Sequence, residues 1–137
     1  MQVSEQEGTL TAAQFEILRL LWNSEAGLTV AEIWAAVCNG RDVSRTTVLN
    51  LVDRLEKRNW LSREKVNGVF RYQAQVDRVT TESQLASEFV GEFFDGSPSN
   101  FVLSLLGSKR ISQTEVKRLR ALLDELPSSA KTRNSKG

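Results

Sequence analysis

The 137-residue sequence contains no histidine and only one cysteine, Cys38. Histidine is the commonest general base and metal ligand in proteins, so its absence removes the most usual acid–base and metal chemistry. A single cysteine can close no intramolecular disulfide and can form no thiolate metal cluster. Cys38 lies on a predicted helix, where a half-buried, unreactive thiol is the expected state. We therefore expect no metal site and no cofactor.

Other signatures of catalysis are missing as well. The sequence has no glycine-rich loop that would cradle a phosphate and no serine-hydrolase turn around a nucleophile. Glu88 and Glu92 lie one helical turn apart and resemble a carboxylate pair, but a solvated helix surface explains them better. The sequence therefore predicts a protein that is not an enzyme.

Long apolar runs are also absent. No stretch approaches the roughly 18–20 apolar residues of a membrane span, and the first residues lack the basic and apolar pattern of a secretion signal. Hydrophobic residues make up 40% of the chain and charged residues 26%, as in a globular protein with a core. We expect a cytoplasmic protein that does not insert into a membrane.

The net charge of +1 conceals an uneven distribution. Residues 29–74 carry eight Lys and Arg against five Asp and Glu, whereas residues 1–28 and 75–127 are acidic overall. Residues 128–137 carry three Lys and Arg and no acid. A local basic excess of this kind suits nucleic-acid binding, although a merely solvated face would have the same composition.

The basic region contains a predicted helix that begins after Ser44 and ends near Asn59. Serine is a favourable N-cap, and asparagine can adopt the left-handed conformation that ends a helix. Apolar residues at i, i+3, i+4 and i+7 give this helix a buried face: Val48, Leu51, Val52 and Leu55. Leu49 flanks the opposite, exposed face, whose polar and basic side chains can contact bases or phosphates. The candidate DNA-binding residues there are Arg45, Thr46, Thr47, Asn50, Arg54 and Lys57.

A β-hairpin is predicted directly after this helix. Asn67-Gly68 separates two short runs and favours the type I′ turn of a tight hairpin. This turn sets the register so that Glu64 lies opposite Arg71, and we expect the two to form a cross-strand ion pair. Lys65 has no such predicted partner. The candidate contacts of the hairpin to phosphates or the minor groove are Arg63, Lys65 and Arg71.

Two shorter helices precede this unit. Thr11-Ala-Ala-Gln14 and Thr29-Val-Ala-Glu32 are capping boxes, in which two side chains satisfy the free N–H groups at a helix start. The predicted apolar face of the first helix consists of Phe15, Leu18, Leu21 and Trp22. Three helices with short connections, followed by a charged hairpin, predict a winged helix-turn-helix. The fold class is therefore mainly α, with residues 1–76 as a DNA-binding domain.

The chain becomes helical again after the hairpin. Ser97-Pro98 is typical of an N-cap followed by a proline at the first helical position, and Ser112-Gln-Thr-Glu115 is a third capping box. Many large apolar residues recur in these helices, and they either form a core on the first domain or pack against a second copy of the chain. Exposure of so large an apolar surface to water is costly, so we favour the second copy.

We accordingly expect residues 77–127 to form a helical dimerisation domain and residues 128–137 a disordered basic tail. A two-fold dimer also doubles the length of DNA that one winged helix reads, over a palindromic site. The candidate interface residues are Leu85, Phe89, Phe93, Phe101, Leu105, Val116, Leu119 and Leu123.

Four segments carry a resemblance to a known family: LTAAQFEILRLLW at 10–22, TVAEI at 29–33, SRTTVLNLVDRLEKRNWL at 44–61, and Arg71-Tyr72. Together they resemble the BlaI/MecI family of penicillinase repressors, which also includes copper-responsive repressors. The resemblance covers the chain from about Leu10 to Leu126. It implies a homodimeric repressor with winged helices on DNA and interlocked C-terminal helices.

The sequence departs from this family in two places and matches a third feature. Asn59 stands where the family usually has glycine, which is a conservative change for a left-handed backbone. The cysteine-rich motif of the copper-responsive members is missing, so copper sensing is not implied. In members induced by β-lactams, a membrane sensor triggers cleavage of an Asn-Phe bond, and Asn100-Phe101 stands in a comparable place. The alternative is that Phe101 is an ordinary core residue near a helix start.

The sequence thus predicts a sequence-specific transcriptional repressor that binds a palindromic operator in double-stranded DNA as a homodimer. Cleavage at Asn100-Phe101 by a membrane sensor and protease system is one way to relieve repression. The alternative from another class is a winged helix that serves as a protein–protein module, with its basic face on an acidic partner.

Overall fold

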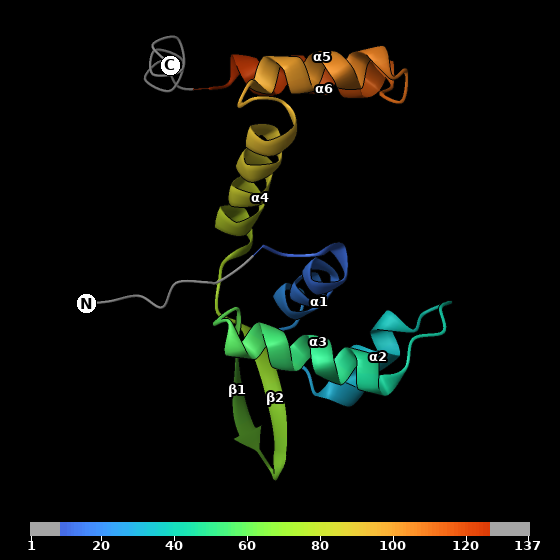
Figure 1. The fold of residues 1–137 in the computed structure, drawn as a ribbon, viewed down its shortest axis with the longest axis vertical. Coiled ribbons are helices and arrows are strands. Elements are labelled where there is room, and N and C mark those ends of the chain that lie inside the picture. The colour runs from blue at the N-terminus through green and yellow to red at the C-terminus, as the bar shows by residue number, and fades with distance from the viewer. Residues whose placement is uncertain (1–8, 127–137) are drawn as a thin grey trace, which may run out of the picture. The chain divides into compact units, whose positions relative to one another are not determined.

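The computed structural model describes residues 9–126. Within this range the chain forms six helices and one two-stranded antiparallel hairpin (Figure 1). The elements are α1 (Ala12–Trp22), α2 (Val30–Val37), α3 (Arg45–Lys57), β1 (Leu61–Val66), β2 (Val69–Ala74), α4 (Arg78–Phe93), α5 (Pro98–Gly107) and α6 (Gln113–Asp124). The mainly helical, winged helix-turn-helix fold predicted from the sequence is confirmed. The expected tail, 128–137, lies outside the described residues.

Two of the three predicted capping boxes are present, at Thr11 and at Thr29, with reciprocal hydrogen bonds of 2.9–3.2 Å. The third is only half formed: the Ser112 hydroxyl accepts from the Glu115 N–H at 3.1 Å, without the reciprocal bond. Asn59 ends α3 in the left-handed region, with φ 68°. The turn of the hairpin has φ 51° at Asn67 and 82° at Gly68, as a type I′ turn requires.

One hydrophobic core joins α1, α2, α3 and the hairpin. Its buried residues are Ile17, Leu18, Leu21, Ile33, Val37, Val48, Val52, Leu55, Trp60, Leu61 and Tyr72. The predicted buried face of α3 is confirmed, with Leu51 half-buried at its edge. In α1, Ile17 is fully buried, although the predicted stripe omits it, while Phe15 and Trp22 are only half-buried. Because α1 contacts α2, α3 and β2 together, its buried face is wider than a single stripe.

The chain divides into two compact units, and the boundary lies inside α4, after Leu85. The first unit thus extends beyond residue 76, where the sequence places the end of the DNA-binding domain. The indole N–H of Trp22 donates to the Val76 carbonyl at 2.9 Å, and the Arg78 guanidinium lies 6.0 Å from the centroid of the Trp22 ring. Thr81 is buried. These contacts join the first turns of α4 to the winged helix.

The start of α4 is capped by Asp77, which the sequence patterns did not predict. Its carboxylate accepts from the Thr80 N–H at 2.9 Å. The hydrogen bonds from Thr80 hold the pKa of Asp77 below its ordinary value. A pKa lowered in the folded state means that this stabilisation is present near neutral pH and is lost as the pH falls through the folded pKa.

The second unit contains the end of α4 together with α5 and α6. It contains an aromatic cluster with ring centroids 5.0–5.9 Å apart, formed by Phe89, Phe93, Phe94 and Phe101. Within α5 and α6 no side chain is buried. Residues 86–126 therefore contain no buried core of the kind that holds the first unit together.

The hairpin is joined to the segment between α1 and α2 by a short piece of backbone pairing. The Leu28 N–H donates to the Tyr72 carbonyl at 3.0 Å, and the Tyr72 N–H donates to the Leu28 carbonyl at 2.8 Å. Gly27, with φ +77°, precedes this pair, and a Cβ at Gly27 would lie 2.7 Å from the Tyr72 carbonyl oxygen. Glycine at this position is therefore needed both for its backbone conformation and for the close approach of β2.

Replacement of Gly27 by alanine should separate β2 from the loop before α2. Gly40→Ala is a matched control, because Gly40 has φ +79° but a Cβ added there would meet no atom within 4 Å. We expect Gly40→Ala to lower the free energy of unfolding by about 1 kcal/mol, the cost of a left-handed alanine. Gly27→Ala should cost about 3 kcal/mol, since the backbone hydrogen bonds are disturbed as well. Urea unfolding measures both, and equal losses would contradict this account.

Candidate nucleic-acid interface

The exposed face of α3 carries the polar and basic residues that the sequence indicated. Arg45, Thr46, Asn50, Arg54 and Lys57 are all exposed. Arg45 and Arg54 take part in no ion pair within residues 9–126. Lys57 Nζ lies 3.2 Å from a carboxylate oxygen of Asp53, one helical turn earlier. Such an exposed ion pair contributes only about 0.3–0.5 kcal/mol to stability. These side chains are therefore available to an external partner.

Thr47 is exposed as well, but it also belongs to the N-cap of α3. Its N–H donates to the Ser44 hydroxyl at 3.1 Å, and the two hydroxyl oxygens are 2.8 Å apart. The side chain thus helps to fix the start of α3, and any contact with DNA would be additional to this role.

Two cations of the hairpin share one aromatic ring. The Arg63 guanidinium carbon lies 4.2 Å from the centroid of Phe70, and Lys65 Nζ lies 5.6 Å from it. Arg63 Nε also contacts a Glu56 carboxylate oxygen at 3.1 Å, which links the hairpin to the last turns of α3. In the described part of the chain Lys65 has no ion-pair partner, as the sequence predicted.

The predicted ion pair between Glu64 and Arg71 is wrong, although the two residues do lie opposite each other in the hairpin. Arg71 instead donates to the Ala26 carbonyl at 3.2 Å, to the Gly27 carbonyl at 3.0 Å and to a Glu32 carboxylate oxygen at 3.2 Å. Three acceptors held by the loop and the capping box outweigh one exposed cross-strand carboxylate. Arg71 therefore braces the hairpin against the start of α2.

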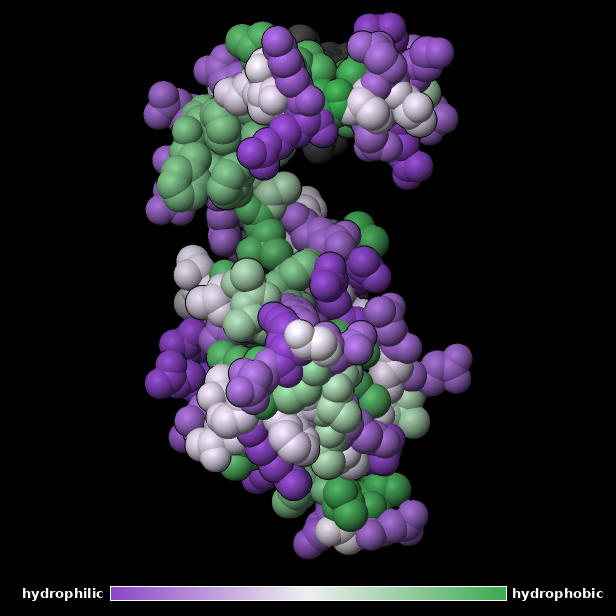
Figure 2. All heavy atoms as spheres, turned by 90° about the vertical axis from the view of Figure 1, so that its right-hand side faces the viewer, coloured by the Kyte–Doolittle hydropathy of each residue, from purple (hydrophilic) through white to green (hydrophobic). Residues whose placement is uncertain are grey.

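A groove of about 390 Å³ lies between α2, α3 and the hairpin. Its apolar lining includes Leu49 of α3 together with Val69 and Phe70 of β2, and Arg45 and Arg63 line it as well. Figure 2 shows hydrophobic side chains at the free end of the hairpin, where Val69 is 51% exposed. The sequence pattern indicated the two arginines but not the groove, whose lining residues are spread along the chain from Thr29 to Tyr72.

Residues 9–126 contain no cluster of three metal-ligating side chains, and none of the helices in this range has the length and apolar character to cross a bilayer. Cys38 is half-buried, and its thiol donates to the Val43 carbonyl at 3.0 Å.

The family model of the penicillinase repressors matches residues 10–125. This chain belongs to the penicillinase repressor family. The resemblance noted in the sequence is thereby confirmed, and the chain is a DNA-binding transcriptional repressor rather than an enzyme. Family membership favours DNA over an acidic protein as the partner of the basic face.

Individual relatives are distant in sequence but similar in length. The methicillin resistance regulatory protein MecI of Mammaliicoccus sciuri is 24% identical over 116 residues, which are 85% of this chain and 94% of that protein. The penicillinase repressor of Staphylococcus aureus is 20% identical over 117 residues, 85% of this chain and 92% of the relative.

Two solved structures of MarR proteins also match. A MarR family protein from Bacillus stearothermophilus and the reduced form of MarR from E. coli each align with a TM-score of 0.46, at 22% and 23% identity. The alignments cover 85% and 86% of this chain, and 71% and 79% of those chains.

The contacts of Arg71 predict a structural role that Lys65 does not share. Arg71→Ala should lower the free energy of unfolding by about 1–2 kcal/mol, because it removes charge-assisted hydrogen bonds to the exposed Ala26 carbonyl and the partly buried Gly27 carbonyl. Lys65→Ala, at an exposed position of the partner strand, should leave it within about 0.5 kcal/mol. Chemical unfolding of the two variants provides the comparison. An unchanged stability of Arg71→Ala would show that the guanidinium does not brace the hairpin.

Proposed function

We propose that this repressor is a homodimer that reads a palindromic operator, with α3 in the major groove and the hairpin on the flanking backbone. The observation that carries this proposal is the exposed face of α3, which presents Arg45, Thr46 and Asn50, with Arg45 in no ion pair within residues 9–126. Arginine pairs with guanine and asparagine with adenine through two hydrogen bonds each, so these side chains suit base reading. Because its target is DNA, we assign the protein to the cytoplasm.

The remaining cations of this surface are suited to phosphates. Arg54 and Lys57 lie on the later turns of α3, and Arg63 and Lys65 lie on β1. Contacts to phosphates position a protein on the duplex without reading its sequence, and they make binding depend on salt. Arg71 is left out of the proposed interface because its guanidinium is engaged within the first unit.

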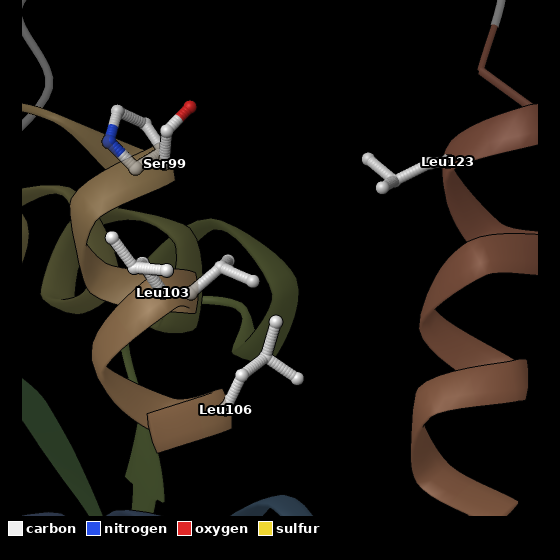
Figure 3. Close-up of a pocket in the computed structure, with 6 residues that line it drawn as sticks. Ser99, Leu103, Leu106 and Leu123 are labelled. Carbon is white, nitrogen blue, oxygen red and sulfur yellow. The ribbon is translucent and has the colours of Figure 1, made fainter. Parts of the chain in front are cut away.

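The proposal of a dimer is supported by apolar surface on the second unit. Leu103 is 67% exposed and Leu123 is 61% exposed. A gap of about 360 Å³ lies between α5 and α6, and Figure 3 shows Leu106 and Leu123 directed toward each other across it. Complete burial of such side chains contributes about 1.5–3 kcal/mol each, so a helix from a second copy would be strongly stabilised there.

Four of the interface residues expected from the sequence are exposed and four are half-buried. Phe89, Phe93, Leu105 and Leu123 are exposed, and Leu85, Phe101, Val116 and Leu119 are half-buried. Leu103, the most exposed leucine of the second unit within the described residues, was not among them. We include it in the proposed interface because it lines the gap together with Leu123.

We further propose that cleavage at Asn100-Phe101 relieves repression, with a membrane sensor and protease system as the partner. Asn100 is exposed in the first turn of α5, and its N–H donates to the Ser97 hydroxyl at 3.1 Å. Phe101 packs on Phe89 and Phe94, with centroids 5.9 and 5.3 Å away. A cut between the two residues would detach α6 and most of α5 from α4, so the dimer and its avidity for two half-sites would be lost.

Asn50→Ala should weaken binding to the operator by about 1–3 kcal/mol while binding to random DNA stays nearly unchanged. Lys65→Ala is the matched comparison for a phosphate contact: it should weaken all sequences alike and reduce the slope of log K against log salt by about one. Gel shifts over a salt series measure both quantities. An equal loss of Asn50→Ala on both DNAs would exclude base reading by this residue.

Leu103→Asp and Leu123→Asp should convert the dimer to a monomer, because each places a charge in the gap between α5 and α6. Val79→Asp is the control, since Val79 is also exposed but belongs to the first unit. Analytical ultracentrifugation at tens of micromolar gives the masses. A monomeric parent chain, or dimeric leucine variants, would contradict the proposed interface.

Cleavage can be tested on the same dimer. A specific protease site inserted between Asn100 and Phe101 should allow a cut that lowers the mass to that of a monomer and weakens operator binding. If the cut protein remains a dimer with full affinity, cleavage at this bond is not the switch.

A further inference from the structure

Leu49 is the one large apolar side chain on the exposed face of α3, where it is 48% exposed. It lies one helical turn after Arg45, on the side of α3 that borders the groove described above. An exposed leucine among polar residues contributes little to the stability of α3 itself. Its exposed part is therefore available to a partner outside the first unit.

The groove places Leu49 beside apolar residues of the hairpin. Val69 and Phe70 of β2 line the same groove and are both exposed. Phe70 is held in place by the Arg63 guanidinium, which stacks over its ring and contacts Glu56. The apolar lining is therefore a built surface that continues from α3 onto the hairpin.

The charges around this surface indicate what it contacts. Arg45 and Arg63 line the groove together with its apolar residues, and no acidic side chain of residues 9–126 lines it. Guanidinium groups beside an apolar strip complement the surface of DNA, where hydrogen-bond acceptors of the bases, phosphates and an apolar group lie close together. In the major groove of DNA that group is the C5-methyl of thymine, which proteins recognise by apolar contact.

We propose that Leu49 of α3 determines specificity by contacting the C5-methyl group of a thymine in each half-site, while the hairpin lies on the flanking backbone. The proposal rests on the proposed function, because it requires α3 to lie in the major groove. Arg45 and Asn50 would read bases through hydrogen bonds, and Leu49 would read one further base, a thymine, through van der Waals contact.

The test uses the full chain and an operator obtained by selection from random DNA. Each thymine of one half-site is replaced singly by deoxyuridine, which removes the methyl group and leaves every hydrogen bond of the base pair unchanged. For the parent protein, at least one replacement should weaken binding about threefold to fivefold, the effect expected for one buried methyl group. Leu49→Ala should bind the thymine and the uracil forms of that position equally.

Comparison of the parent protein with Leu49→Ala distinguishes loss of the contact to one methyl group from a general weakening of DNA binding. At the other thymines, Leu49→Ala should keep the sensitivity of the parent protein, as a pairwise coupling requires. Absence of any uracil-sensitive position, or an unchanged sensitivity in Leu49→Ala, would overturn the proposal while leaving operator binding intact. Sensitivity that is lost in Phe70→Ala but kept in Leu49→Ala would also overturn it, since the reader would then be on the hairpin. Failure to select any operator would instead overturn the proposed function.

Discussion

The candidate DNA-binding surface, which consists of the exposed face of α3 and the hairpin, depends on the backbone pairing between Leu28 and Tyr72. These two hydrogen bonds attach the hairpin to the loop before α2, and they require the close approach that Gly27 permits. Arg71 strengthens the same junction through the carbonyls of Ala26 and Gly27. Because α2 and α3 share one core with the hairpin, this junction also sets the distance between the hairpin and α3. A protein that reads DNA with two elements needs such a fixed spacing between them.

The parts of the fold that depend on neighbouring residues were predictable from the sequence. Helix starts at Thr11 and Thr29, the end of α3 at Asn59 and the turn at Asn67-Gly68 each follow from side chains within a few residues. The exposed face of α3 was also predictable, since helical periodicity decides which side is buried.

The partner of Arg71, the burial of Ile17 and the groove beside Leu49 were not predictable in this way. Each depends on segments that are distant in sequence, such as the 45 positions between Ala26 and Arg71. The apolar periodicity of α1 does not show how many other elements pack against it, so it could not predict the burial of Ile17. The register of the hairpin places Arg71 opposite Glu64 but does not determine which acceptors the long arginine side chain reaches. The two units also differ in this respect: the first has a buried core that explains its fold, whereas no side chain of α5 or α6 is buried.

The central claim is that two identical recognition surfaces act together on one DNA site, and selection of bound sequences from a random pool tests it most directly. The full-length protein, at an ionic strength near physiological, should enrich an inverted repeat. Its two half-sites should be separated, centre to centre, by about 10–10.5 base pairs or a multiple of this helical repeat. Enrichment of a single unrepeated motif would contradict the paired arrangement, and the absence of any enriched sequence would contradict specific reading by α3.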